Sequence, residues 1–160
     1  AQVGNMVESI EEQLGTVDVL VNNAGITRDG SFKKMSPENW DAVMKANVYS
    51  VFNCCRHVIN PMIDQGYGRI INISSVNGQR GQFGQANYAT AKSGIFGFTR
   101  TLALELAPSG STVNSVAPGF TRTDMLDEVR EDIQERILEE IPMGRFAEVE
   151  DISHGEVVLC

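Results

Sequence analysis

Apolar and polar residues alternate along the chain in two different periods, and the order of these periods predicts the fold. Near the N-terminus the spacing is three and four, the apolar stripe of a helix that Gly15 is placed to end; the stripe consists of Val3, Met6, Val7, Ile10 and Leu14. A short apolar run closed by turn residues follows at 17–25, which is typical of a strand buried on both faces of a parallel sheet.

The same two patterns then repeat. Ser36 is placed as an N-cap before Pro37, which favours a helix that continues to about Met62. A second buried strand is predicted over 68–75, and a loop rich in glycine and glutamine follows it over 76–85.

A long helix is predicted over about 86–107, with a core stripe that includes Ile95 and Leu102. Gly94 and Gly97 lie inside it, where each costs about 1 kcal/mol relative to alanine, so they suggest close packing against a neighbour. A third strand over 111–119 and two helices at roughly 123–140 and 148–159 complete the pattern. This alternation predicts an α/β fold, a Rossmann-like doubly wound parallel sheet.

Polar turn residues follow each predicted strand, at 22–25, 74–85 and 118–123. In open parallel sheets, ligands bind outside the carboxyl ends of the strands. The three clusters are therefore expected to line one crevice.

The composition argues against several classes of function. With 160 residues, 42% of them hydrophobic, the chain is expected to form one domain, and its formal charge of −8 argues against a nucleic-acid partner. The three cysteines have no zinc-site spacing and are expected to be reduced and buried, and we expect no metal. No apolar run is long enough to span a bilayer and the N-terminus does not look like a signal peptide, so a cytoplasmic protein without membrane contact is the default.

A tyrosine and a lysine stand four positions apart at the start of the long helix, which puts Tyr88 and Lys92 on one face. The pair has a structural interpretation, in which the tyrosine is half-buried packing and the lysine is solvated. It also has a chemical one, because a cation within roughly 4–6 Å lowers the pKa of a phenol by about 1–3 units and makes it a better proton donor.

Read in order, "NNAG" after the first strand, Asn47 in the next helix, "ISS" after the second strand, Tyr-x-x-x-Lys and "PG" after the third strand resemble the classical short-chain dehydrogenase/reductase family. The resemblance implies that Tyr88 protonates a carbonyl oxygen, that Ser75 orients this oxygen, and that Lys92 also binds the nicotinamide ribose. Asn47 would hold a water that links Lys92 to solvent. Taken singly, Ser75 also fits a turn residue and Asn47 a solvent-facing one.

The resemblance further implies two sets of binding residues. Cofactor contacts are expected, besides Tyr88 and Lys92, from Asn23, Ala24, Gly25, Pro118, Gly119, Thr121 and Thr123, although the family often has an aliphatic residue where Thr121 stands. Substrate contacts are expected, besides Ser75 and Tyr88, from Gln82, Phe83 and Gln85, for which a polar surface loop is the alternative.

Within the family, the segments 22–43 and 71–88 resemble reductases of acetoacetyl-CoA in polyhydroxyalkanoate synthesis. This implies reduction of a 3-oxoacyl thioester by NADPH, with NADH left open, in a homotetramer built through helices 37–62 and 86–107. The alternatives are reduction of a 3-oxoacyl carrier protein and an inactive truncated chain. The family's glycine-rich pyrophosphate turn has no counterpart, so residues 1–160 are expected to be a partial domain, truncated at both ends of the sheet.

Overall fold

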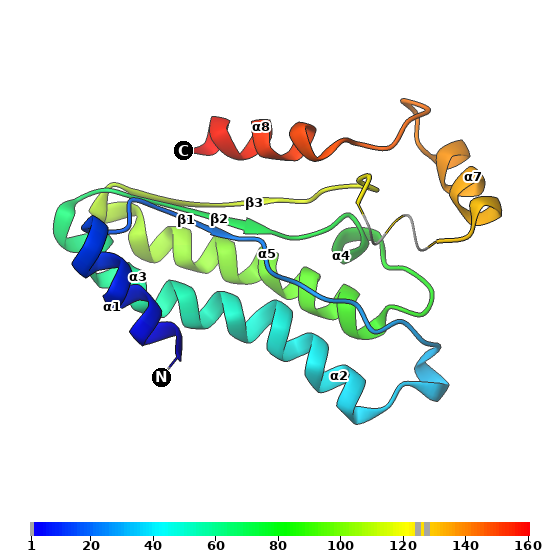
Figure 1. Cartoon of the computed structure of the whole chain (residues 1–160), viewed down its shortest axis with the longest axis horizontal. Coiled ribbons are helices and arrows are strands. Elements are labelled where there is room, and N and C mark those ends of the chain that lie inside the picture. The colour runs from blue at the N-terminus through cyan, green and yellow to red at the C-terminus, as the bar shows by residue number, and fades with distance from the viewer. Residues whose placement is uncertain (1, 124–125, 127–128) are drawn as a thin grey trace.

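The structure is a computed structural model that describes residues 2–123, 126 and 129–160 (Figure 1). Its helices and strands alternate as the sequence predicts. In chain order they are α1 (Gln2–Leu14), β1 (Val19–Asn22), a 3₁₀ turn η1 (Phe32–Lys34), α2 (Pro37–Met44), a π-helical turn η2 (Lys45–Tyr49), α3 (Ser50–Gln65), β2 (Gly68–Ile73), α4 (Asn77–Arg80), α5 (Ala86–Leu106), a 3₁₀ turn η3 (Ala107–Ser109), β3 (Ser111–Val116), α7 (Glu131–Glu140) and α8 (Val149–Leu159).

The three strands form one parallel sheet in the order β1-β2-β3, with Val19 opposite Arg69 and Gly68 opposite Ser111. Helices α3 and α5 pack on one face of this sheet, and α1 packs on α3 (Figure 1). Helix α8 lies over the other face, against β2 and β3. The α/β class and the parallel sheet predicted from the sequence are confirmed.

The segment from Pro37 to Gln65 is one rod made of α2, η2 and α3. Ser36 caps it as predicted, because its side chain accepts a hydrogen bond from the Asn39 backbone N–H at 3.2 Å. Gly66, in the left-handed conformation at φ 72°, ends it three residues beyond the predicted end. The π-helical turn in its middle was not predicted, and such turns are frequent at functional sites.

The core lies between the sheet and its two long helices. Its buried members come from α1, α3, the strands and α5, and they are Val7, Val51, Cys55, Val58, Met62, Ile70, Ile95, Leu102, Leu106 and Val113. Of the other two cysteines, which were also expected to be buried, Cys54 is half-buried and Cys160 is exposed. All three are free thiols, as expected.

Three sequence predictions need correction. Strand β1 is shorter than predicted and is not buried on both faces, since Val19 and Val21 are 37% and 39% exposed. The reason is that, among the described residues, β1 pairs with β2 alone and α3 covers one of its faces. The loop after β2 contains the short helix α4. Of the helix predicted over 123–140, α7 covers Glu131–Glu140 and Leu126 is also helical, while residues 124–125 and 127–128 lie outside the described residues.

The two glycines of α5 also behave differently from the prediction. A Cβ added at Gly94 or Gly97 would meet no atom within 4 Å. Both residues are exposed, so no neighbour within the described chain accounts for them.

Candidate active site

Lys92 is buried under the carboxyl end of β2. Its side chain is only 4% exposed, and its Nζ donates a 2.6 Å hydrogen bond to the backbone carbonyl of Ile73. Burial lowers the pKa of this ammonium to about 8. The interpretation of Lys92 as a solvated surface lysine is therefore wrong.

Asn47 lies in the π-helical turn and is fully buried. Its amide holds the loop after β1, because Oδ1 accepts from the Ile26 N–H at 3.0 Å and Nδ2 donates to the Ile26 carbonyl at 2.9 Å. Nδ2 also donates to the Val43 carbonyl at 3.0 Å, so both of its protons are used. The solvent-facing interpretation of Asn47 is wrong.

Gly25 joins these two side chains. A Cβ at this position would lie 2.5 Å from Asn47 Oδ1 and 3.5 Å from Lys92 Nζ. Only glycine therefore fits without a shift of Asn47. The backbone of "NNAG" passes directly over the buried amide and ammonium, as a site that brings a ligand close to the main chain requires.

Ser75 and Tyr88 complete the group. Ser75 is buried, and its Oγ accepts from the Asn77 backbone N–H at 3.1 Å, so it is a turn residue as well as a candidate for chemistry. Tyr88 is half-buried, and the Lys92 Nζ lies 5.8 Å from the centre of its ring.

The expectation that Lys92 lowers the pKa of Tyr88 is wrong for this structure. Burial raises the pKa of the phenol, hydrogen bonding with Ser75 opposes this rise, and the negative charge of Asp29 adds to it. The Lys92 Nζ donates to the Ile73 carbonyl and lies 5.8 Å from the centre of the Tyr88 ring, and the pKa of the phenol is raised in spite of this cation.

The polar clusters after the three strands lie at one edge of the sheet, since parallel neighbours end on the same side. Asn23, Ala24, Gly25, Gly119 and Thr123 are exposed there, and Pro118 and Thr121 are half-buried. The Val76 N–H donates to the Pro118 carbonyl at 2.9 Å and joins the second cluster to the third. Val76 and Gly119 also line a cavity of about 540 Å³ whose other walls include Phe120, Ile141 and Met143.

The three residues expected to contact the substrate differ in whether their side chains are available to a ligand. Phe83 is 90% exposed and Gln82 is also exposed, so both are available to a ligand. The amide of Gln85 is already used, since its Nε2 donates to Asp29 Oδ2 at 2.9 Å and its Oε1 accepts from Asn77 Nδ2 at 3.0 Å.

Sequence reasoning missed a buried polar chain beneath the site. Asn22 Nδ2 donates to Asn72 Oδ1 at 2.9 Å, and Asn72 Nδ2 donates to Thr99 Oγ1 at 3.0 Å. These bonds tie β1, β2 and α5 together directly below the strand ends. A signal for them was present in the sequence: Asn72 is the one polar residue in the apolar run "IINI".

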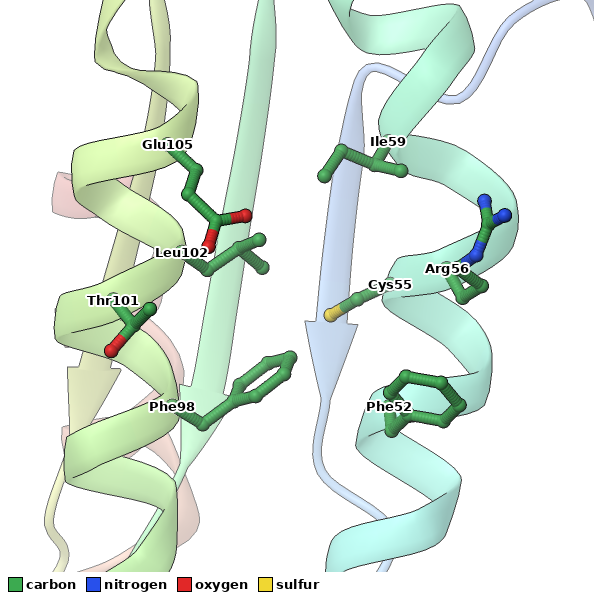
Figure 2. Close-up of a pocket in the computed structure, with 8 residues that line it drawn as sticks. All are labelled: Phe52, Cys55, Arg56, Ile59, Phe98, Thr101, Leu102 and Glu105. Carbon is green, nitrogen blue, oxygen red and sulfur yellow. The ribbon is translucent and has the colours of Figure 1, made fainter.

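A second hollow lies away from the site, between α3 and α5, and measures about 220 Å³ (Figure 2). Side chains from the two helices line it from opposite sides: Phe52, Cys55, Arg56 and Ile59 of α3, and Phe98, Thr101, Leu102 and Glu105 of α5. We call it the α3–α5 groove.

Two kinds of feature are absent from the described residues. No described helix has the length and apolar character needed to cross a membrane. Within the same part of the chain, no three His, Cys, Asp or Glu side chains gather as a metal-ion site.

The parallel sheet, with Asn47, Ser75, Tyr88 and Lys92 gathered at its carboxyl edge, has the arrangement of a nicotinamide-dependent oxidoreductase. The family model for short chain dehydrogenases matches residues 1–134, and the chain belongs to this family. The resemblance inferred from the motifs is therefore confirmed.

The chain is also similar to individual curated proteins of known name. The chain is 52% identical over 146 residues to an acetoacetyl-CoA reductase of Cupriavidus necator, a match that covers 91% of this chain and 59% of the relative. It is 54% identical over 147 residues to nodulation protein G of Azospirillum brasilense, covering 92% and 60%. A 3-oxoacyl-(acyl-carrier-protein) reductase of Staphylococcus epidermidis is 46% identical over 159 residues, covering 99% and 65%. The chain thus spans less than two thirds of the length of these relatives.

Proposed function

We propose that this chain is the catalytic part of a reductase that converts a 3-oxoacyl thioester, acetoacetyl-CoA, to its 3-hydroxy product. The observation that carries the proposal is the gathering of Asn47, Ser75, Tyr88 and Lys92 at the carboxyl edge of the sheet, with Lys92 and Asn47 buried although they are polar. Relatives named acetoacetyl-CoA reductase, at 52% and 53% identity, support the choice of substrate.

The residues present fit a nicotinamide cofactor. Gly25 leaves the backbone bare directly over Lys92 Nζ, and the residues from Asn23 to Gly25 are exposed beside it, as binding of a ribose and a flat ring requires. Pro118, Gly119, Thr121 and Thr123 border the same edge from β3. We propose NADPH as the cofactor; when bound, it supplies the hydride.

Residues of this chain would then orient and protonate the carbonyl oxygen of the substrate. Tyr88 donates its phenolic proton to that oxygen, and Ser75 donates a hydrogen bond that orients it. Lys92 would hold the cofactor ribose through its Nζ, which lies 5.8 Å from the centre of the Tyr88 ring. Because both amide protons of Asn47 are bound to carbonyls, a water near Lys92 would be held by the remaining lone pair of Asn47 Oδ1 or by backbone carbonyls of the π-helical turn.

The acyl chain and the pantetheine arm of the substrate would lie along the loop after β2. Phe83 offers an exposed aromatic face and Gln82 an exposed amide to the acyl chain and the pantetheine arm. A carrier protein is the second candidate, favoured by the relative at 46% identity. Carrier proteins present acidic surfaces, and a chain with a formal charge of −8 does not favour such an encounter.

We further propose that the whole protein is a homotetramer that uses the α3–α5 groove as an interface. Phe52 is 51% exposed at this groove, and on the same helix as Phe98 the glycines Gly94 and Gly97 have open space around them. Such a face fits close approach of a second copy. A cytoplasmic location stays a prediction from the sequence.

The test compares substrates and cofactors with the whole protein. We expect oxidation of NADPH with acetoacetyl-CoA, at a kcat/KM above that with acetoacetyl carrier protein, and a loss with Phe83→Ala that affects the CoA substrate but not cofactor binding. A preference for the carrier protein that collapses in Arg122→Glu would assign the protein to fatty-acid synthesis instead. The 160-residue chain alone is expected not to bind NADPH, since it holds no glycine-rich pyrophosphate turn.

A further inference from the structure

Two adjacent residues at the end of β2 hold Lys92 at two different atoms. The carbonyl of Ile73 accepts a 2.6 Å hydrogen bond from Lys92 Nζ, and the hydroxyl of Ser74 donates a 2.7 Å hydrogen bond to the backbone carbonyl of Lys92. The charged end of the side chain and the main chain of the same residue are therefore both bound to one short piece of the strand end.

The bond from Ser74 is additional to the hydrogen bonds of the helix. An α-helical carbonyl already accepts from the N–H four residues later, and its oxygen can accept one more hydrogen bond. The Ser74 bond is of this second kind, since Lys92 lies in the interior of α5. Its effect is to tie the helix to the sheet at the level of the lysine.

Ser74 is itself fixed in position. It is 3% exposed, and its backbone N–H donates at 2.7 Å to the carbonyl of Val116, the last residue of β3. Two residues earlier, Asn72 donates to Thr99 further along α5 at 3.0 Å. Alternate residues of a strand point to one face, so Asn72 and Ser74 both reach the helix. The end of β2 can therefore determine where this part of α5 lies.

The peptide unit that Ser74 bonds is also contacted by α4. A Cβ at Gly78 would lie 2.8 Å from the Lys92 carbonyl carbon and 2.8 Å from the Ser93 nitrogen. The backbone of α4 thus packs directly against the peptide that links these two residues. The segment 73–78 therefore sets the position of one turn of α5, and that turn carries Lys92.

The position of the Lys92 backbone matters because the side chain is long and buried. A lysine has a flexible four-carbon stem, and Lys92 is only 4% exposed. One of its three ammonium protons is bound to the Ile73 carbonyl, which determines where the other two can point. A shift of the helix away from the strand end would lengthen this bond and move the ammonium relative to the proposed cofactor.

We propose that Ser74 is a positioning residue for Lys92: its hydroxyl holds the α5 backbone against the end of β2 and so keeps the ammonium at the carboxyl edge of the sheet. The proposal rests on the proposed function in one respect, that a nicotinamide cofactor is the ligand of this ammonium. It gives two adjacent serines different roles, since the Ser74 hydroxyl is bound to the helix whereas Ser75 is expected to orient the substrate.

The test removes one hydroxyl from the whole protein. Ser74→Ala deletes the bond to the Lys92 carbonyl and is expected to raise the Kd of NADPH by about threefold to tenfold, the factor typical of one buried hydrogen bond. The KM of the thioester at saturating NADPH is expected to stay unchanged, because the lost bond goes to the Lys92 backbone. Fluorescence of the reduced cofactor measures the Kd without substrate.

A matched control removes a similar bond at the other end of the same helix. The Ser109 hydroxyl donates to the carbonyl of Leu106, the last residue of α5, at 2.7 Å, the same length as the bond from Ser74. Ser109→Ala is expected to lower the urea midpoint and to leave the Kd of NADPH unchanged. An unchanged Kd in Ser74→Ala would overturn the proposal, as would a rise in the thioester KM at constant Kd.

Unfolding separates this proposal from the proposed function, because it needs neither cofactor nor substrate. Burial lowers the pKa of Lys92 to about 8, so the parent protein gains stability relative to its Lys92→Met counterpart as the pH rises from 8 to 10.5. If the Ser74 hydroxyl keeps the ammonium buried, this gain is smaller when Ser74→Ala is introduced into both proteins. Ser109→Ala, introduced in the same way, is expected to leave the gain unchanged.

The paired design also removes the contribution of the neighbouring phenol. The centre of the Tyr88 ring lies 5.8 Å from Lys92 Nζ, and Tyr88 is present in both members of each pair, so its own titration cancels. An equal gain with and without the Ser74 hydroxyl would overturn the proposal even in an active reductase. A whole protein that binds no NADPH, but whose gain is reduced in Ser74→Ala, would overturn the proposed function alone.

Discussion

The carboxyl edge of the sheet and the α3–α5 groove are built in opposite ways. At the edge, polar side chains such as Asn47 and Lys92 are buried and hydrogen-bonded within the chain. At the groove, large apolar side chains such as Phe52 are exposed. The polar groups of the edge are therefore paired within the chain, whereas the groove leaves apolar surface that a second copy is proposed to cover.

Glycines show the same difference at the level of single atoms. A Cβ at Gly78 would lie 2.8 Å from backbone atoms of Lys92 and Ser93, so α4 can approach α5 only without a side chain there. A Cβ at Gly97 meets nothing within 4 Å. The same residue type thus marks a filled contact in one region and an open surface in the other.

The largest expected effect is at the edge. Tyr88→Phe keeps the ring and removes the proton donor, so turnover of acetoacetyl-CoA by the whole protein is expected to fall by on the order of 100-fold or more. Absorbance of the reduced cofactor measures the rate. The control is Tyr49→Phe, because Tyr49 is exposed and its hydroxyl has no hydrogen bond to the described residues. Activity retained in Tyr88→Phe would remove the central element of the proposed site.

The second prediction uses the burial of Lys92. Because its folded pKa of about 8 is below the unfolded value of 10.5, the unfolded chain binds more protons between these two values, and stability rises with pH across that window. Compared with Lys92→Met, the parent protein is expected to gain on the order of 3 kcal/mol between pH 8 and pH 10.5. Urea unfolding of both proteins at several pH values measures the difference, and a difference that does not change with pH would contradict it.

The third prediction compares the two glycines directly. Gly78→Ala forces α4 away from the Lys92 backbone and is expected to cost about 1–3 kcal/mol of unfolding free energy. Gly97→Ala fills open space in an exposed helix and is expected to add up to about 1 kcal/mol to the stability of the protomer.

The oligomeric state provides a separate test of the role of Gly97. If a second copy packs at Gly97, then Gly97→Leu is expected to lower the oligomeric state seen by sedimentation while the protomer stays folded. A whole protein that is monomeric at micromolar concentration would remove the proposed interface.

The smallest effect is expected at the mouth of the cavity. Arg80 Nη1 lies 3.5 Å from Glu140 Oε2, and both side chains are largely exposed, at 41% and 67%. Such pairs contribute about 0–1 kcal/mol. Arg80→Gln is therefore expected to leave the unfolding midpoint nearly unchanged, and a large loss would show that the cavity wall depends on this ion pair.

Much of the fold follows from local patterns that the structure confirms. Ser36 marks the start of the long rod as predicted, because an N-cap acts over a single turn. The predicted end at about Met62 is three residues short, since the rod ends at Gln65, before the left-handed Gly66. The π-helical turn at Asn47 has no such local signature, since it depends on a bond between its side chain and the distant Ile26 backbone.

The spacing of residues in the sequence predicted the candidate site, but it did not predict the pKa shifts of the site's side chains. The four-residue interval correctly brings Tyr88 and Lys92 to one face. The sign of the Tyr88 pKa shift depends on burial and on Asp29, which lies 59 positions away from Tyr88 in the chain and is brought close only by the fold. The sequence likewise does not show that Asp29 and Asn77 occupy the amide of Gln85, whose contact with a substrate stays a prediction.

The parallel register of the sheet has a consequence for how the protein acquires its structure. Asn22 and Asn72, which pair across β1 and β2, are 50 residues apart, and the whole rod from Pro37 to Gln65 lies between them. Parallel pairs of this kind close late, since a long loop loses its entropy before any ladder bond forms. During synthesis, β1 is therefore expected to stay unpaired until β2 has left the ribosome, while the helices between them can already form.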